Sequence, residues 1–148
     1  MNRADFRFLH PLRVRWAEVD RQDVVFNGHY LLYFDVAITE YWRAVGLPYQ
    51  ALLDQHDADL YVVKAGLEYH GPARFDDELE IGVRVRKIGN SSIVFDLGIF
   101  RQGEHLIEGE IVYVNANPRT KKPSTVPVAV RELMAKLEGR PELAAVPI

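Results

Sequence analysis

The chain has 148 residues with a formal net charge of −3 and no cysteine, which excludes disulfides, thiolate metal sites and cysteine nucleophiles. The slightly negative charge argues against broad binding to nucleic acid or membrane surfaces. Because no apolar run could span a bilayer and the N-terminus lacks the apolar stretch of a secretory signal, we expect one cytoplasmic domain, residues 1–148.

The first part of the chain predicts one strand and one long helix. Residues 12–16 alternate apolar and polar side chains, which is typical of a half-buried strand. Residues 30–45 carry polar side chains only along one narrow stripe, so this helix is expected to be buried nearly all round. Gly46 and Pro48 end the helix, and residues 48–55 are consistent with a short second helix.

The second part predicts an antiparallel sheet, because apolar residues recur at every second position between short turns. The strands are expected at residues 61–69, 79–85, 93–99 and 106–114. In the first of them, one face is expected to hold Tyr61, Val63, Ala65, Leu67 and Tyr69. A loop and a short terminal helix, residues 128–137, follow. The pattern predicts an α+β domain, with a five-stranded antiparallel sheet wrapped around one long central helix.

The segment between the first strand and the long helix carries the candidate chemistry. Asp20 lies close to the start of the helix, where backbone N–H groups are free and the helix dipole is positive. Two such N–H groups, among Asn27, Gly28 and His29, can stabilise negative charge on a carbonyl oxygen. Asp20 can then deprotonate water or attack the carbonyl itself. The alternatives are ordinary ones: an N-cap or turn role for Asp20 and Asn27, and a packed or surface histidine for His29.

Three segments, residues 20–30, 69–79 and 87–92, together support a family comparison. The first reads Asp-x-x-Asp-Val-Val-Phe-Asn-x-x-Tyr, and the chain resembles the hot-dog-fold acyl-CoA thioesterases of the 4-hydroxybenzoyl-CoA thioesterase type. The resemblance implies that Asp20 is the catalytic carboxylate and that the Asn27 N–H, with its neighbours, polarises the thioester carbonyl. It also implies a mainly structural role for Tyr30.

The chain departs from this family pattern at two positions. Asp23 stands where the family usually has glycine, although aspartate tolerates the left-handed conformation better than most residues. A second carboxylate so close could perturb the pKa of Asp20 or compete for its role, but a solvated turn residue is the favoured interpretation. Asn27 replaces the histidine of some family branches, which leaves His29 as the nearest imidazole.

The implied substrate is an acyl-CoA, with coenzyme A entering as part of the substrate and no separate cofactor. Its phosphates need cationic partners, and its pantetheine amides need hydrogen-bonding groups. The candidates for coenzyme A binding are Arg74, Lys87, Ser91, Ser92, Arg119 and Lys121, with Arg86 and Lys122 also available. No metal site is predicted, because the remaining histidines are isolated and lack metal-ligand spacing.

Hydrolysis of an acyl-CoA is the favoured function, and two other classes stay open. One is a non-catalytic acyl-CoA-binding module, which Asp23 keeps under consideration. The other, less favoured, is an acyl-thioester dehydratase or hydratase, which usually depends on a histidine as well as an acid.

The strand at residues 60–69 is long, β-rich and poor in charge, so we expect it to be an exposed sheet edge that pairs with its own copy. The family resemblance implies the same homodimer or a homotetramer, with active sites shared between subunits. Partners in nucleic acid or membrane are not expected.

Overall fold

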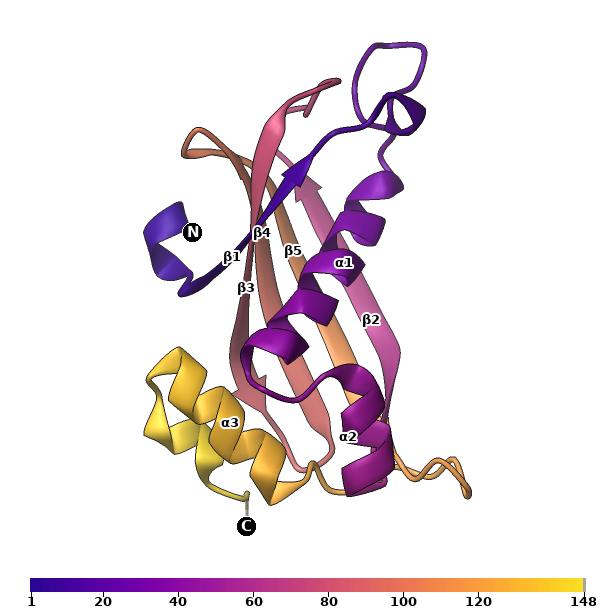
Figure 1. Cartoon of the computed structure of the whole chain (residues 1–148), viewed down its shortest axis with the longest axis vertical. Helices are drawn as coiled ribbons and strands as arrows, with labels where there is room; N and C mark the ends of the chain where they lie inside the picture. Colours follow the sequence, from indigo (N-terminus) through magenta and orange to yellow (C-terminus); the bar gives the residue numbers. More distant parts are fainter. Residues whose placement is uncertain (148) are drawn as a thin grey trace.

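A long helix lies across one face of a five-stranded antiparallel sheet in the computed structural model, which describes residues 1–147 (Figure 1). The main elements are β1 (Phe8–Arg13), α1 (His29–Ala44), α2 (Tyr49–His56), β2 (Asp59–Tyr69), β3 (Glu78–Ile88), β4 (Ser92–Arg101), β5 (Glu104–Ala116) and α3 (Val128–Glu138). The strand order is β1-β3-β4-β5-β2, which leaves β1 and β2 at the edges. The predicted α+β hot-dog arrangement is confirmed. No helix among the described residues is long and apolar enough to cross a membrane.

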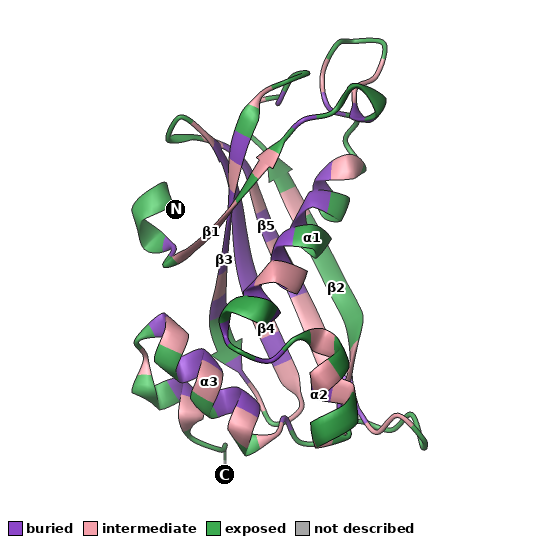
Figure 2. Ribbon diagram, viewed as in Figure 1, coloured by how far each residue is buried: buried purple, intermediate pink, exposed green. Residues whose placement is uncertain are grey.

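The core lies between α1 and the inner face of β3, β4 and β5. Every second residue of β3 and β4 belongs to the face that α1 covers, and these residues are fully buried. Buried positions accordingly dominate these two strands in Figure 2. One glycine sets how closely the helix can approach: a Cβ on Gly109 of β5 would lie 2.5 Å from the ring of Phe34, which is itself completely buried. The missing side chain at Gly109 therefore makes room for Phe34.

The first strand differs from its predicted position. It spans Phe8–Arg13 rather than residues 12–16, and it pairs with β3 from Phe8 opposite Val83 to Arg13 opposite Glu78. The Val14 N–H still donates to the Asp77 carbonyl at 2.9 Å, and the Val14 carbonyl accepts the Asp76 N–H at 3.1 Å. Because β3 begins at Glu78, the chain does not continue as a strand beyond these bonds. It turns instead into a short 3-10 helix, Trp16–Glu18, which leads to the Asp20 loop.

A bulge in β2 changes which residues face the helix. The β2–β5 register shifts between Val62 and Lys64, and this leaves Val63 without a partner on β5. Ala65, Leu67 and Tyr69 share a face, as predicted. Before the bulge, the residue on this face is Val62, which lies opposite Tyr113, and the prediction of Tyr61 and Val63 was wrong. One inserted residue exchanges the two faces of the strand for all residues before it. The alternation of apolar and polar residues in the sequence does not show where such an insertion occurs.

The helix α1 is not buried nearly all round, contrary to the sequence prediction. Its inner face is buried, but Leu31, Leu32 and Val36 are 39%, 57% and 43% exposed in the single chain. They add to exposed apolar residues on the neighbouring edge strand β2, including Val62 and Val63. An exposed apolar surface beside an open sheet edge is typical of a site of association.

The close approach of α1 to β5 can be tested with two glycines of the sheet. Gly109→Ala should lower the free energy of unfolding by about 1–3 kcal/mol, because the new methyl group overlaps the Phe34 ring. Gly66→Ala is the matched control on β2, since its Cβ would meet no atom within 4 Å. Urea unfolding of both variants measures the difference, and equal stability of the two would contradict the packing argument.

Candidate active site

Asp20 lies in a tight turn that its own backbone and side chain hold closed. The Asp20 N–H donates to the Val24 carbonyl at 2.9 Å, and the Asp23 N–H donates to the Asp20 carbonyl at 3.0 Å. The Gln22 N–H donates to Oδ1 of Asp20 at 2.7 Å. Oδ2 of Asp20 accepts no hydrogen bond within residues 1–147. One carboxylate oxygen therefore fixes the side chain and the other is open to a substrate or a water molecule.

Asp23 adopts a left-handed backbone conformation, which a glycine at this position of the family pattern would also allow. Its φ is +60°, in the left-handed region that aspartate tolerates, and its side chain is exposed. The preference for a solvated turn residue at this position agrees with this geometry. Asp23, the residue that kept a binding-only function under consideration, is therefore part of a closed turn, in which its N–H donates to the Asp20 carbonyl.

The start of α1 presents two open backbone donors. The N–H groups of Asn27 and Gly28 have no hydrogen-bond partner within the described part of the chain, and both residues are exposed. The His29 N–H, in contrast, donates to the Phe26 carbonyl at 2.8 Å, so it is already used. The N-cap residue is Gly28, with no side-chain cap, so Asn27 does not serve as the N-cap.

Asp20 and Asn27 line one cavity of about 320 Å³. Its remaining walls come from the Asp20 loop, the first turn of α1 and the turn that follows β2: Gln22, Val24, Val25, Tyr30, Tyr69, His70, Gly71 and Pro72. The residue with the open carboxylate oxygen and a residue with a free backbone N–H thus line the same cavity. Its apolar and aromatic walls suit an acyl group beside them.

Tyr30 joins α1 to the turn after β2, which fits the structural role implied by the resemblance. Its side chain is only 2% exposed, and its hydroxyl accepts a hydrogen bond from the Ala73 N–H at 3.1 Å. Burial raises the pKa of Tyr30, so the phenol stays neutral. Tyr69 stands beside it, with ring centres 5.8 Å apart, and its hydroxyl donates to the Asn27 carbonyl at 3.3 Å.

Glu18 is a buried carboxylate whose role the sequence analysis missed. It accepts hydrogen bonds from the Tyr33 hydroxyl at 2.8 Å and from the Arg15 N–H at 2.7 Å, while its carbonyl accepts the Phe26 N–H at 2.9 Å. Burial alone would raise the pKa of Glu18, but the hydrogen bonds from Arg15 and Tyr33 outweigh it and hold the pKa below its usual value. The only sequence signal was the spacing of Arg15 and Glu18.

The predicted coenzyme A residues fall at two ends of the sheet. Arg74 lies in the turn before β3, at the same end as Asp20 (Figure 1). The other candidates lie at the opposite end, from the end of β3 to the start of β4 and in the loop after β5: Lys87, Ser91, Ser92, Arg119 and Lys121. Arg119 is paired with Asp57 at 2.8 and 3.1 Å, and Lys121 contacts the Tyr61 hydroxyl at 3.3 Å. A single chain therefore does not bring them to Asp20.

Comparisons with known proteins place this geometry in a family. The model of the thioesterase superfamily matches residues 22–108. The acyl-CoA thioester hydrolase YbgC of Escherichia coli O6:H1 is 33% identical over 131 residues, which cover 88% of this chain and 96% of the relative. A solved thioesterase from Thermus thermophilus, complexed with coenzyme A and Zn, is 28% identical with a TM-score of 0.80, covering 93% of this chain and 98% of that one.

A hot-dog domain that places a carboxylate beside the start of its central helix is typical of one class of enzymes, the thioesterases. The chain is a member of the thioesterase superfamily.

Proposed function

We propose that this chain hydrolyses the thioester bond of an acyl-CoA, releasing a free acid and coenzyme A. One observation carries the proposal: Asp20, which has an open carboxylate oxygen, and Asn27, which has a free backbone N–H, line one cavity. The Escherichia coli relative is an acyl-CoA thioester hydrolase and the Thermus thermophilus thioesterase is complexed with coenzyme A, and both support the same substrate class.

In the proposed reaction, the thioester carbonyl oxygen lies against the N–H groups of Asn27 and Gly28. Asp20 either takes a proton from an attacking water molecule or attacks the carbonyl carbon itself to form a mixed anhydride. In both routes negative charge builds on the carbonyl oxygen, and the two N–H groups with the positive helix end stabilise it. The carbon–sulfur bond then breaks and coenzyme A leaves as the thiolate. In the anhydride route, water subsequently releases the acid from Asp20.

We further propose that a second copy completes the site. The edge strand β2 and the adjoining face of α1 expose Val62, Val63, Leu32 and Val36, which a monomer would leave in water. A two-fold axis beside β2 pairs it with its own copy in antiparallel fashion. That pairing brings the Asp59 end of one strand next to the Tyr69 end of the other.

This arrangement gives the distant cations a role. The loop with Arg119 and Lys121 follows the end of β5 that pairs with Asp59, so a second copy would carry these residues towards the Asp20 end of the first. Lys121 is the better phosphate ligand of the two, because Arg119 is already bound by Asp57 through two hydrogen bonds. A cytoplasmic location remains a prediction.

The role of Asp20 can be tested by removing its charge. Asp20→Asn should fold normally and lose acyl-CoA turnover by about 10²–10⁴-fold, because the amide is neither a base nor a nucleophile. Asp23→Asn is the matched control, since asparagine also tolerates the φ of +60°. Thiol release from a panel of acyl-CoA substrates gives the readout. Full activity of Asp20→Asn with loss in Asp23→Asn would move the role to Asp23, and a wild type that binds but hydrolyses none would indicate a binding module.

The assembly can be tested at the bulge of β2. Sedimentation should show wild-type protein no smaller than a dimer at micromolar concentration. Val63→Pro should weaken association while sparing the β2–β5 register, because Val63 has no partner on β5. Val63→Ala keeps the backbone N–H and should remain associated. A fully active wild-type monomer would contradict the shared site.

A further inference from the structure

Two carboxylates face each other without compensation on the outer face of the sheet, away from α1. Glu68 of β2 is directly opposite Glu108 of β5 in the strand register, so their side chains project from the same face. Like charges in this position destabilise a sheet. The only basic group within ion-pairing distance of Glu68 among residues 1–147 is His70, at 3.9 Å, and Glu108 forms no ion pair there.

The neighbouring acidic residues of this face are neutralised, which sets the Glu68–Glu108 pair apart. Asp96 is paired with Arg84 at 3.4 Å and with Arg86 at 3.2 Å. Glu110, two residues along the strand from Glu108, is paired with Lys64 at 3.0 Å and also with Arg86. The series of ion pairs on this face therefore ends before Glu108, and the end of β2 is left with uncompensated negative charge.

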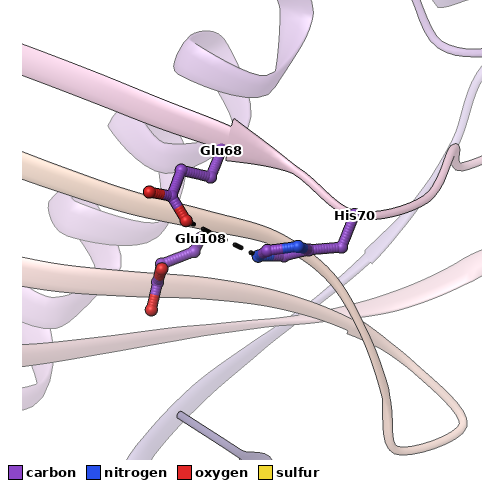
Figure 3. A group of neighbouring side chains, drawn as sticks. All are labelled: Glu68, His70 and Glu108. Atoms are coloured by element: carbon purple, nitrogen blue, oxygen red, sulfur yellow. Dashed lines mark ion pairs between the residues drawn. The ribbon is translucent and has the colours of Figure 1, made fainter.

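His70 joins the two carboxylates in one cluster (Figure 3). One ligand atom from each of Glu68, His70 and Glu108 lies within 4.8 Å of the others. Ligand atoms around a tetrahedral ion with bonds of about 2.1 Å lie about 3.4 Å apart, so a modest contraction is needed. Glu68 and His70 have the freedom for it, because their side chains are 69% and 45% exposed. The backbone of His70 is fixed by its N–H, which donates to Leu106 at 2.8 Å.

His105 lies beside the cluster and carries a polar atom without a hydrogen-bond partner among the described residues. The ring of His105 lies 5.1 Å from the ring of His70, centre to centre, and stacks on Phe100. Its Nε2 is buried and has no hydrogen-bond partner within residues 1–147. A buried polar atom without a partner is costly, and such atoms are rare in native structures. A metal ion bound at His70 would supply a counter-charge for the two carboxylates.

We propose that Glu68, His70 and Glu108 form a site for a divalent transition-metal ion, with Zn²⁺ as the best match. Two carboxylates and one imidazole give a mixed oxygen and nitrogen ligand set, which suits Zn²⁺ better than Mg²⁺ or Ca²⁺. Because the side chains of Glu68 and His70 are exposed, a water molecule can occupy the fourth coordination position of the ion. The ion would connect the end of β2 to β5. It would lie next to the segment Tyr69, His70 and Gly71, which lines the Asp20 cavity. The proposal does not rest on the proposed hydrolysis, because it uses neither Asp20 nor the helix start, although His70 also lines the Asp20 cavity.

The test is calorimetric titration of ZnCl₂ into untagged, chelator-treated wild-type protein, together with thermal unfolding. We expect one Zn²⁺ per chain and a rise in Tm with the metal. Glu108→Gln and His70→Gln should each weaken binding by at least about tenfold and lose the Tm rise. Glu110→Gln on the same strand face and His56→Gln at the end of α2 are the matched controls and should bind as the wild type does.

A second readout separates a metal site from a purely structural cluster. Without metal, Glu108→Gln should have a higher Tm than the wild type, because the substitution removes the repulsion with Glu68. When Zn²⁺ is added, the Tm of the wild type should rise and the Tm of the variant should not. The absence of saturable Zn²⁺ binding would overturn the proposal. So would binding that survives both Glu108→Gln and His70→Gln, or binding lost to the same extent in His56→Gln.

Discussion

The buried carboxylate of Glu18 ties the first half of the α1 helix to the loop that carries Asp20, and the chemistry at this end depends on that connection. The side chain accepts the Tyr33 hydroxyl of α1, and the backbone carbonyl accepts the Phe26 N–H just before the helix begins. Asp20 and the free donors of Asn27 and Gly28 therefore belong to one short segment, which Glu18 connects to Phe26 and to Tyr33 of α1. The helix in turn is positioned on the sheet by the contact between Phe34 and Gly109.

Much of the fold could be predicted because its signals are local. Alternation along β3 and β4 and the long apolar run of α1 identified the α+β architecture, and the turns between strands implied antiparallel pairing. The errors have non-local causes. β1 ends at Arg13 because β3 begins at Glu78, and the faces of β2 reverse because of the bulge at Val63. The exposed face of α1 was missed because the single sheet covers only one side of the helix and leaves Leu31, Leu32 and Val36 partly in solvent.

The candidate site shows the same division. Asp20, Asn27 and Gly28 were suggested by one contiguous motif, and the thioesterase class that this motif implied is confirmed by the family match. The use of the His29 N–H by Phe26 and the network around Glu18 depend on three-dimensional hydrogen bonding, which spacing does not encode. The cluster of Glu68 and Glu108 was likewise invisible, because only the β2–β5 register brings these residues together.

The most direct test of the account is the turnover of two variants at Gly28. Its φ of −70° fits proline, and a Cβ there lies 3.1 Å from the Phe26 ring in either variant, so Gly28→Pro and Gly28→Ala differ chiefly in the backbone N–H. If the helix start stabilises the oxyanion, kcat of Gly28→Pro should fall about 10²–10³-fold while Gly28→Ala stays close to the wild type. Equal turnover of the two folded variants would contradict the assignment of this donor.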